Sequence, residues 1–484
     1  MLLNIEKLIY GGDGLARLPA DSRGRGKAVF VPFVLAGEKI EAALTEEKSG
    51  FARAHAEAII QPSPHRVLPP CPHFARCGGC HYQQAAYPHQ LEIKQEILRE
   101  NLRRIARLEL PCEIEVHPSP PWNYRNRSRL QVRTRPDFAA GYFKFASHEL
   151  LPVEECPISS PLINRGIAAL WKSGRAGQAV EGVREVEFFA SPAANGDPDE
   201  KESNLLLEFV CDPEARRAAV RAWAEELCAS LPEIAGVVAF REPQKGVQEL
   251  LVTVGASQLI YQTKHSAYRV SAGSFFQTNR FLIDELIAIV TGGRSGELAL
   301  DLYAGVGLFS TALACGIRHI VSVESSQTAA KDLQYNLPVN GKVANAGTEQ
   351  YLAELGHKGR AEPAATGQRA VRQGAVGNGA VGNGAVGNGA VGNGAVGNGA
   401  ALPQVLHDPD LLVVDPPRGG LGDRVARLLA DVGAPRITYV SCDPATLARD
   451  LIPLQAAGYR VDQIHLVDLF PQTYHLETVL HLTR

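Results

Sequence analysis

The stretch LALDLYAGVGLFS, residues 298–310, decides how the C-terminal part of this chain folds. Its apolar beginning is typical of a buried strand, AGVG of a tight turn, and LFS of the start of a helix. Gly305 and Gly307 have no side chains, so the backbone of this turn can approach a nucleotide-like ligand closely. The stretch therefore predicts the first strand, turn and helix of a ligand-binding α/β sheet.

Strand-like and helical segments continue to alternate after this unit. The strand-like runs are HIVSVES, LLVVDPP, RITYVSC and YRVDQIHLVDLF, and helices are expected from Leu308 and near residues 326–336. This order predicts a doubly wound parallel sheet over residues 271–484. The pentapeptide GAVGN repeats within it, without charge and with little side-chain volume, so we expect a disordered low-complexity insertion at about residues 358–404.

A carboxylate, Glu324, ends the strand-like run HIVSVES. From this position a carboxylate usually binds both hydroxyls of a ribose. The chain has neither a GxxxxGK phosphate loop nor a complete GxGxxG. The combination favours S-adenosylmethionine over a dinucleotide or a nucleoside triphosphate, with a solvated carboxylate as the alternative interpretation of Glu324.

Two further side chains follow strands of the same predicted sheet. Asp415 ends LLVVDPP, and Cys442 stands between RITYVS and a helix. Since the carboxyl ends of parallel strands share one edge, both should lie where such sheets bind ligands. The start of the helix predicts a stabilised Cys442 thiolate, although a lone buried cysteine is more often inert.

The final segment, DLFPQTYHLETVLHL, places Glu477 in an otherwise apolar strand. A carboxylate in such a strand is expected to be paired or to take part in the chemistry of the protein. Its neighbour His475 is interpreted as a strand-surface or core histidine.

Three cysteines lie within CPHFARCGGC, residues 71–80, and EECPI supplies a fourth, Cys156. Four thiolates suit tetrahedral zinc or a four-iron cluster. Zinc sites more often use two CxxC pairs, so the isolated fourth cysteine favours iron–sulfur. Radical enzymes that combine such a cluster with S-adenosylmethionine typically show CxxxCxxC, and the longer first gap here argues against them.

The remaining sequence predicts two further domains. Short β-type runs in residues 1–62 predict a small OB-like β-barrel of the kind that binds oligonucleotides. Residues 63–270 hold the cysteine segment, the amphipathic helix HQLEIKQEILRENLRRIA and several strand-like runs, and predict an α+β central domain.

Composition narrows the class of protein. The chain has 484 residues, 45% of them hydrophobic, and a formal charge of −3, which excludes a globally basic nucleic-acid binder. Local basic stretches such as NLRRIARL and YRNRSRLQVRTR can still contact phosphate. The number of cysteines is odd, nine, and the six in the first half lack the paired spacing of a secreted disulfide scaffold. The sequence also shows no signal peptide and no long apolar run. We therefore expect a cytoplasmic monomer without a membrane anchor.

Six motifs in order resemble one enzyme family. They are CPHFARCGGCHYQ, SFFQTN, DLYAGVGLFS, DPPRGGL, SCDPATLARDL and FPQTYHLETV, and they span nearly the whole chain apart from the repeat. The chain is similar to the uridine carbon-5 RNA methyltransferases, and specifically to the iron–sulfur branch that acts on 23S ribosomal RNA and carries an N-terminal TRAM domain. This resemblance implies a Rossmann-like class I methyltransferase domain at the C-terminus.

The resemblance also implies a role for each residue in these motifs. Cys442 matches the nucleophile and Glu477 the base, the cofactor-binding positions are Gln277, Tyr303, Glu324 and Asp415, and the ligands of a [4Fe-4S] cluster are Cys71, Cys77, Cys80 and Cys156. Two motifs depart from the usual pattern. Asp443 stands where many members have asparagine, and Thr348 where an acidic residue is usual.

The implied reaction is S-adenosylmethionine-dependent methylation of carbon 5 of a flipped uridine in RNA, through a cysteine adduct at carbon 6. The leading interpretation takes 23S rRNA as the substrate. The same reaction on tRNA is an alternative, and a non-catalytic RNA-binding protein is a third. Intact Cys442 and Glu477 disfavour the third.

Overall fold

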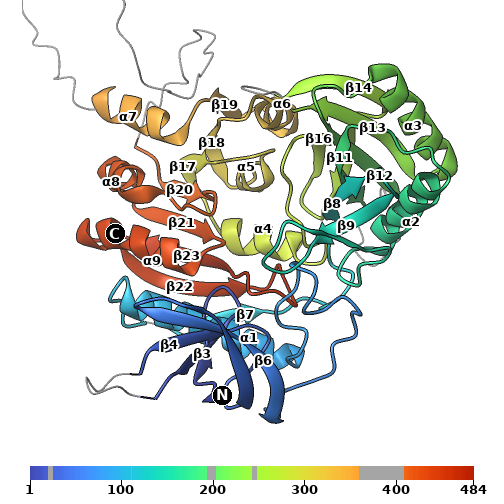
Figure 1. Cartoon of the computed structure of the whole chain (residues 1–484). Helices are drawn as coiled ribbons and strands as arrows, with labels where there is room; N and C mark the ends of the chain where they lie inside the picture. Colours follow the sequence, from blue (N-terminus) through green and yellow to red (C-terminus); the bar gives the residue numbers. More distant parts are fainter. Residues whose placement is uncertain (20–25, 111, 193–202, 243–247, 359–407) are drawn as a thin grey trace, which may run out of the picture.

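The computed structural model describes residues 1–19, 26–110, 112–192, 203–242, 248–358 and 408–484 (Figure 1). Residues 359–404 of the predicted insertion lie outside the described residues. The described part combines three large sheets with helices, which confirms the predicted α/β fold class with an N-terminal β domain and a C-terminal doubly wound sheet. The exact domain boundaries stay predictions.

The N-terminal part is a six-stranded sheet that is antiparallel except where β4 and β6 run parallel. It packs around its own small core, which includes Leu3, Val29 and Ile40. In spatial order its strands are β1 (Leu2–Asn4), β5 (Lys39–Glu47), β6 (Phe51–Gln61), β4 (Ala28–Val31), β3 (Gly14–Arg17) and β2 (Lys7–Leu8).

The central part is a seven-stranded sheet whose core lies under two helices, α2 (Pro161–Arg175) and α3 (Arg217–Ser230). Ser160 caps α2 by accepting a hydrogen bond from the Ile163 N–H. In spatial order the strands are β10 (Leu150–Pro152), β9 (Ala139–Phe143), β8 (Arg127–Arg133), β11 (Val183–Ser191), β12 (Asn204–Cys211), β13 (Ile234–Arg241) and β14 (Glu249–Gly255).

The C-terminal part is an eight-stranded sheet. In spatial order the strands are β19 (Gly341–Asn345), β18 (Ile317–Glu324), β17 (Gly296–Leu302), β20 (Leu411–Val414), β21 (Arg436–Ser441), β23 (Glu477–Thr483), β22 (Arg460–Val467) and β7 (Ile114–His117). The first five run parallel, and β23 is antiparallel to both of its neighbours. The eighth strand, β7, comes from far upstream and runs parallel to β22.

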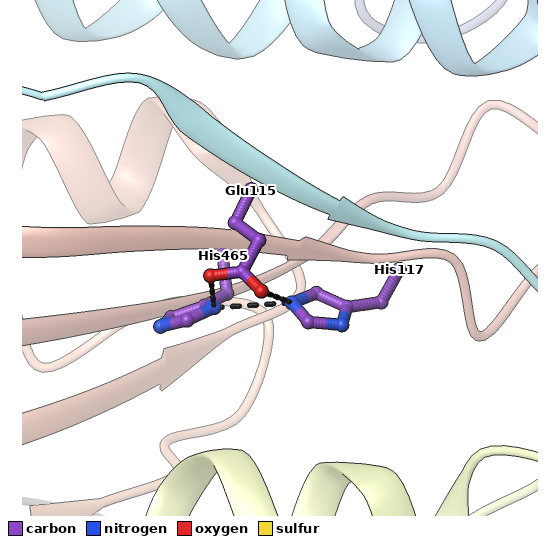
Figure 2. Close-up of side chains that lie close together, drawn as sticks. All are labelled: Glu115, His117 and His465. Carbon is purple, nitrogen blue, oxygen red and sulfur yellow. Dashed lines mark hydrogen bonds and ion pairs between the residues drawn. The ribbon is translucent and has the colours of Figure 1, made fainter.

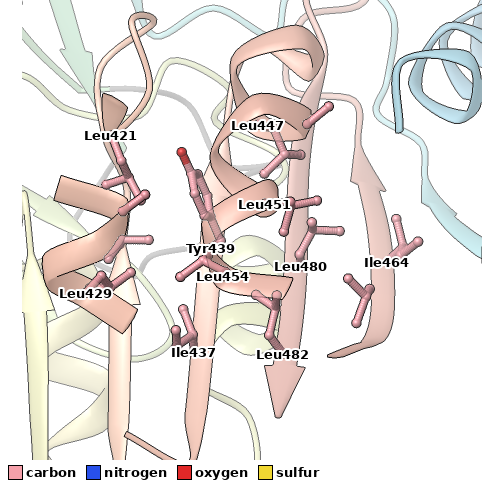
Figure 3. Close-up of a cluster of buried hydrophobic side chains, with 14 of the residues drawn as sticks. Leu421, Leu429, Ile437, Tyr439, Leu447, Leu451, Leu454, Ile464, Leu480 and Leu482 are labelled. Atoms are coloured by element: carbon pink, nitrogen blue, oxygen red, sulfur yellow. The ribbon is translucent and has the colours of Figure 1, made fainter. Parts of the chain in front are cut away.

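Alternating side chains of this sheet enter two hydrophobic clusters. Leu298, Leu300 and Leu302 of β17 face one cluster, which Figure 3 shows in part, whereas Ala299 faces the other. The first is covered by α1 (Tyr87–Arg104), α7 (Thr348–Lys358), α8 (Gly422–Val432) and α9 (Pro444–Ala456). The second is covered by α4 (Ile283–Thr291), α5 (Leu308–Leu313) and the hairpin of β15 (Gln258–Gln262) and β16 (Ala267–Ser271).

Helix α1 connects an upstream segment to the C-terminal sheet. The predicted amphipathic helix forms α1, and its apolar residues Ile93, Ile97, Leu98 and Leu102 belong to the core of the C-terminal sheet. The helix expected near residues 326–336 forms as α6 (Gln327–Asn336). None of the helices in the described ranges is long and apolar enough to cross a membrane.

Candidate active site

The carboxyl edge of the eight-stranded sheet gathers the predicted reactive residues. Asp415 directly follows β20, Cys442 directly follows β21, and Glu477 is the first residue of β23, which pairs with β21. Glu324 is the last residue of β18. Because backbone ladders fix each of these strand ends, the sheet holds all four side chains at one edge without any ligand.

The glycine turn after β17 has the backbone that its sequence predicts. Tyr303, Gly305 and Gly307 all have positive φ angles, of 63°, 55° and 94°. The Gly305 N–H donates a hydrogen bond of 2.9 Å to Glu324 Oε2, so the turn and the next strand end are directly connected. No heavy atom outside the adjoining residues lies within 4 Å of where a Gly305 side chain would start, which leaves space for a ligand.

Of the two remaining predicted cofactor residues, Tyr303 lies in this turn and Gln277 lies between β16 and α4. The hydroxyl of Tyr303 forms a hydrogen bond with the side chain of Thr348, the first residue of α7. Gln277 is buried, and its carbonyl accepts a hydrogen bond of 3.0 Å from Asn126 Nδ2. Its neighbour Phe276 belongs to the same hydrophobic cluster as Val306 of the turn.

Asp301, within β17, is a buried residue that the sequence analysis did not single out. Its side chain is fully buried, Oδ2 accepts a hydrogen bond from the Ser310 hydroxyl, and Oδ1 has no partner in the described structure. Burial raises the pKa of Asp301 to about 7. The signal in the sequence was available, because an aspartate interrupts the apolar run LALDL.

Negative side chains surround Cys442. Burial, followed by the charges of Glu477 and Asp415, raises the pKa of its thiol to about 12, while Arg418 acts in the opposite direction. Burial and Asp415 likewise raise the pKa of Glu477, and burial together with Asp301 raises that of Asp415 to about 7. The sequence analysis predicted a thiolate stabilised by the start of α9. Burial is the main effect that opposes this charge, and the neighbouring carboxyl groups add to it, so the thiolate stays a prediction.

The N-terminal sheet reaches this edge through one side chain. The hydroxyl of Tyr10, in the turn between β2 and β3, donates a hydrogen bond of 3.1 Å to the carbonyl of Cys442. Its ring also meets the ring of Tyr474 edge-on, at 5.5 Å between centroids. Cys442 is therefore held partly by a residue more than 400 positions away, which no local pattern could indicate.

The four predicted cluster ligands lie near one another, and Cys80 and Cys156 belong to the same small hydrophobic cluster. Burial and the neighbouring thiols raise the pKa of Cys71, Cys77 and Cys80, and in all three Cys156 is among the thiols responsible. Hydrogen bonds with the Asn164 side chain hold both the N–H and the carbonyl of Cys156. All nine cysteines have free thiols.

The segment that follows Cys80 contacts the loop that leads to Glu477. The N–H groups of His81 and Tyr82 both donate to the carbonyl of Gln472, at 2.9 Å and 3.0 Å. The Gln90 side chain of α1 bonds the same residue at its N–H and at its amide oxygen. The cysteine segment thus positions part of the C-terminal loop.

His475, in that loop, is partly buried, and burial lowers its pKa to about 3, in agreement with a structural histidine.

Comparison with known proteins adds to this geometry. A sequence model of the tRNA (uracil-5-)-methyltransferase family matches residues 237–354 and 406–484, and a TRAM-domain model matches residues 1–56. An RNA methyltransferase of Aquifex aeolicus, itself named uncharacterized, is 30% identical over 481 residues, which are 99% of this chain and 97% of that protein. The chain belongs to the tRNA (uracil-5-)-methyltransferase family.

Two further comparisons agree with the assignment of this chain to the tRNA (uracil-5-)-methyltransferase family. A Streptomyces coelicolor protein, also named an uncharacterized RNA methyltransferase, is 31% identical over 99% of this chain and 91% of its own length. The crystal structure of Pyrococcus abyssi tRNA (uracil-54, C5)-methyltransferase in complex with S-adenosyl-L-homocysteine covers 99% of both chains with a TM-score of 0.67 and 22% identity. That likeness confirms the fold, and the homologues show that the chain is an RNA methyltransferase.

The ranges that match the tRNA (uracil-5-)-methyltransferase model include all the predicted reactive and cofactor-binding residues, from Gln277 to Glu477. The four cysteines lie outside both matched models.

Proposed function

We propose that this enzyme transfers a methyl group from S-adenosylmethionine to carbon 5 of a uridine in 23S rRNA. The observation that carries the proposal is the position of Cys442, Asp415 and Glu477 at one sheet edge, beside a glycine turn that ends against Glu324. A nucleophile next to a buried carboxylate is what this reaction requires, because carbon 5 of uridine does not attack an electrophile unaided.

The residues present fit S-adenosylmethionine. The turn leaves open space at Gly305, Asp301 Oδ1 is buried without a partner, and carboxylates line the edge on which a sulfonium cation would lie. Glu324, Asp415, Gln277 and Tyr303 are the side chains proposed to hold it. When bound, this cofactor supplies an electrophilic methyl group.

Two side chains, Cys442 and Glu477, carry out the proposed bond-forming and proton-removing steps. The Cys442 sulfur bonds to carbon 6 of the uracil, the 5,6 double bond opens, and carbon 5 becomes nucleophilic enough to accept the methyl group. Glu477 then removes the proton from carbon 5, the double bond reforms, and the bond between sulfur and carbon 6 breaks. The uridine must leave any helical stack for the sulfur to reach carbon 6.

The high pKa of Cys442 gives the first step a condition. Burial and the neighbouring carboxyl groups raise the pKa of this thiol to about 12, so the thiol has to lose its proton before the sulfur can attack carbon 6. The carboxylates of Glu477 and Asp415, whose own pKa values are raised, are the bases close enough to affect that thiol.

We further propose that Cys71, Cys77, Cys80 and Cys156 bind a [4Fe-4S] cluster. Tetrahedral zinc at about 2.3 Å from each sulfur would bring the sulfurs to about 3.8 Å from one another. No three of these four described thiols have sulfurs all within 4.8 Å of each other, and a cluster is wider because each thiolate binds a different iron. The guanidinium of Arg125 lowers the pKa of Cys77 and Cys80 and brings a positive charge to the site.

The deciding experiment maps 5-methyluridine in 23S rRNA and in tRNA from cells with and without the protein. Loss of one 5-methyluridine from 23S rRNA is expected, and loss from tRNA alone would establish the alternative substrate. The purified Glu477→Gln variant should accumulate a covalent protein–RNA adduct on denaturing gels, since the methyl group is transferred but the proton is not removed. Absence of both the modification and the adduct would refute the proposed reaction.

A further inference from the structure

A second group of histidine and glutamate side chains lies on β22 and β7, the two strands that follow β23, which carries Glu477, in the spatial order of the sheet. Glu115 and His117 come from β7, and His465 comes from the neighbouring β22 (Figure 2). One ligand atom from each of the three lies within 4.8 Å of the other two. No part of the proposed methyl transfer uses these residues.

The sheet itself brings the three side chains together. Side chains alternate between the faces of a strand, so Glu115 and His117 project from the same face of β7. In the parallel register between β7 and β22, Glu115 lies opposite His465. Neighbouring strands are about 4.8 Å apart, which is the right spacing for imidazole and carboxylate groups to share one ion.

The distances match a tetrahedral ion. Ligands at about 2.0–2.1 Å from zinc are about 3.3 Å from one another. Here His117 Nε2 and His465 Nδ1 are 3.0 Å apart, and Glu115 oxygens lie 3.4 Å from His465 Nδ1 and 3.8 Å from His117 Nε2. The three separations bracket the ideal value, and each histidine directs a different ring nitrogen to the common point.

A fourth side chain completes the arrangement. Glu285, from α4, which covers this face of the sheet, lies 2.6 Å from the other ring nitrogen of His117. Histidines that bind zinc typically donate their second N–H to a carboxylate in this way, which fixes the tautomer that leaves Nε2 free for the metal. Both histidine side chains are 11% exposed, whereas Glu115 is 66% exposed, so solvent reaches the site from one side.

We propose that Glu115, His117 and His465 bind one divalent transition-metal ion, with water as the fourth ligand. Two imidazoles and a carboxylate are ligands of zinc, and the same set excludes calcium and magnesium, which prefer oxygen. The ion joins β7 to the sheet and is structural. The competing interpretation is a proton shared between the two imidazoles, which needs no metal.

The test uses the full-length protein treated with EDTA. The protein is purified without oxygen so that a cluster at the four cysteines is not lost by oxidation. Zn²⁺ is titrated against a chromophoric chelator, and iron content is measured in parallel so that loss of a cluster is not counted as a zinc site. The wild-type protein is expected to bind one more Zn²⁺ than the His117→Gln/His465→Gln double variant, and to melt at a higher temperature with Zn²⁺. Co²⁺ at this site should lack the intense charge-transfer absorption of thiolate ligands.

Two single variants keep the test decisive if the double variant does not fold. Glu115→Gln changes a largely exposed side chain and should weaken Zn²⁺ binding at least about tenfold, which corresponds to about 1.4 kcal/mol. His319→Gln changes an exposed histidine of the same sheet and should leave binding unchanged. Equal Zn²⁺ stoichiometry in the wild-type and double-variant proteins, or unchanged affinity in Glu115→Gln, would overturn the proposal and favour the shared proton.

Discussion

At the carboxyl edge of the eight-stranded sheet, Asp415, Cys442 and Glu477 stand at strand ends that backbone ladders hold in place, whereas Cys71 and Cys77 lie in turns outside the named strands. Negative charges on the three side chains of the first group repel one another. The side chains cannot move apart, because β20, β21 and β23 set their positions. The second group is held by a few loop hydrogen bonds and by neighbours such as Asn164. A sheet edge can therefore be built before its ligand arrives, while loops that carry metal ligands depend on the group they bind.

The largest expected effect tests the edge. Cys442→Ala should reduce methyl transfer by at least about three orders of magnitude, because no other group can form the bond to carbon 6. Affinity for S-adenosylhomocysteine, measured by calorimetry, should change little, since the strands stay in place. Measurable turnover by this variant would show that the cysteine is not the nucleophile.

The next effect tests whether the loop before Glu477 shares the rigidity of the edge. Lys94 of α1 is fully buried, and its ammonium donates to Asp468 Oδ1 at 2.6 Å and to the carbonyl of Phe470 at 3.0 Å. Lys94→Ala leaves a buried carboxylate without its cation and should cost about 3–5 kcal/mol in urea unfolding. The Lys94→Met/Asp468→Leu variant is the control and should recover part of that loss; a neutral Lys94→Ala change would mean that the loop is not held this way.

A pH-dependent effect tests the raised pKa of the buried carboxyl groups near this edge. The pKa of Asp301 is about 7 in the folded protein and about 3.9 in an unfolded chain. Between these values the folded state binds more protons, so stability should be highest below about pH 4 for this group and fall as pH rises towards 7, by up to about 1.4 kcal/mol per pH unit. Asp301→Asn should flatten this decline in denaturant unfolding at several pH values. Asp415 contributes in the same direction, so the slope should be reduced and not abolished, and an unchanged slope would contradict the assignment.

The cysteine segment should respond differently from the edge. Cys156→Ser should remove or weaken the brown colour of anaerobically purified protein and lower its stability by about 2–4 kcal/mol, the usual range for a lost covalent cross-link. Turnover per folded molecule should fall far less than in Cys442→Ala. Cys315→Ser, at an exposed cysteine, is the matched control. Colourless wild-type protein with one equivalent of zinc would show that the metal is not iron.

The smallest expected effect tests the contact between the N-terminal sheet and the edge. Tyr10→Phe removes the hydrogen bond to the Cys442 carbonyl, which should cost about 0.5–1.5 kcal/mol, or up to roughly tenfold in kcat. Cofactor affinity should not change. An unchanged kcat would mean that the sheet edge alone positions the cysteine.

The sequence predicted what is local or periodic. The strand, turn and helix at residues 298–310, the helix α1 and the strand-end positions of Glu324, Asp415 and Cys442 all follow from short patterns, and the structure has them. The electrostatics of Cys442 did not follow, because the start of α9 is visible in the sequence while the carboxylates of Glu477 and Asp415 approach only through tertiary structure.

Long-range pairing was also beyond the sequence. The four residues of β7 carry too little pattern to be recognised as a strand, and their partner β22 lies near the other end of the chain. The pairing of Glu115 with His465, and the contact of Tyr10 with Cys442, therefore could not be predicted. Both depend on which segments the fold brings together.

The position of β7 has a consequence for how this chain is synthesised. A ribosome releases residues 114–117 early, but their hydrogen-bonding partner, residues 460–467, emerges almost last. Until then α1 exposes an apolar face that finally packs on the C-terminal sheet. Closing so long a loop has an entropic cost, and because that cost is met before the distant segments pair, such pairings lower the folding rate. The final sheet can therefore form only after translation is nearly complete, and the nascent chain is exposed to aggregation, and to the chaperones that prevent it, for most of its synthesis.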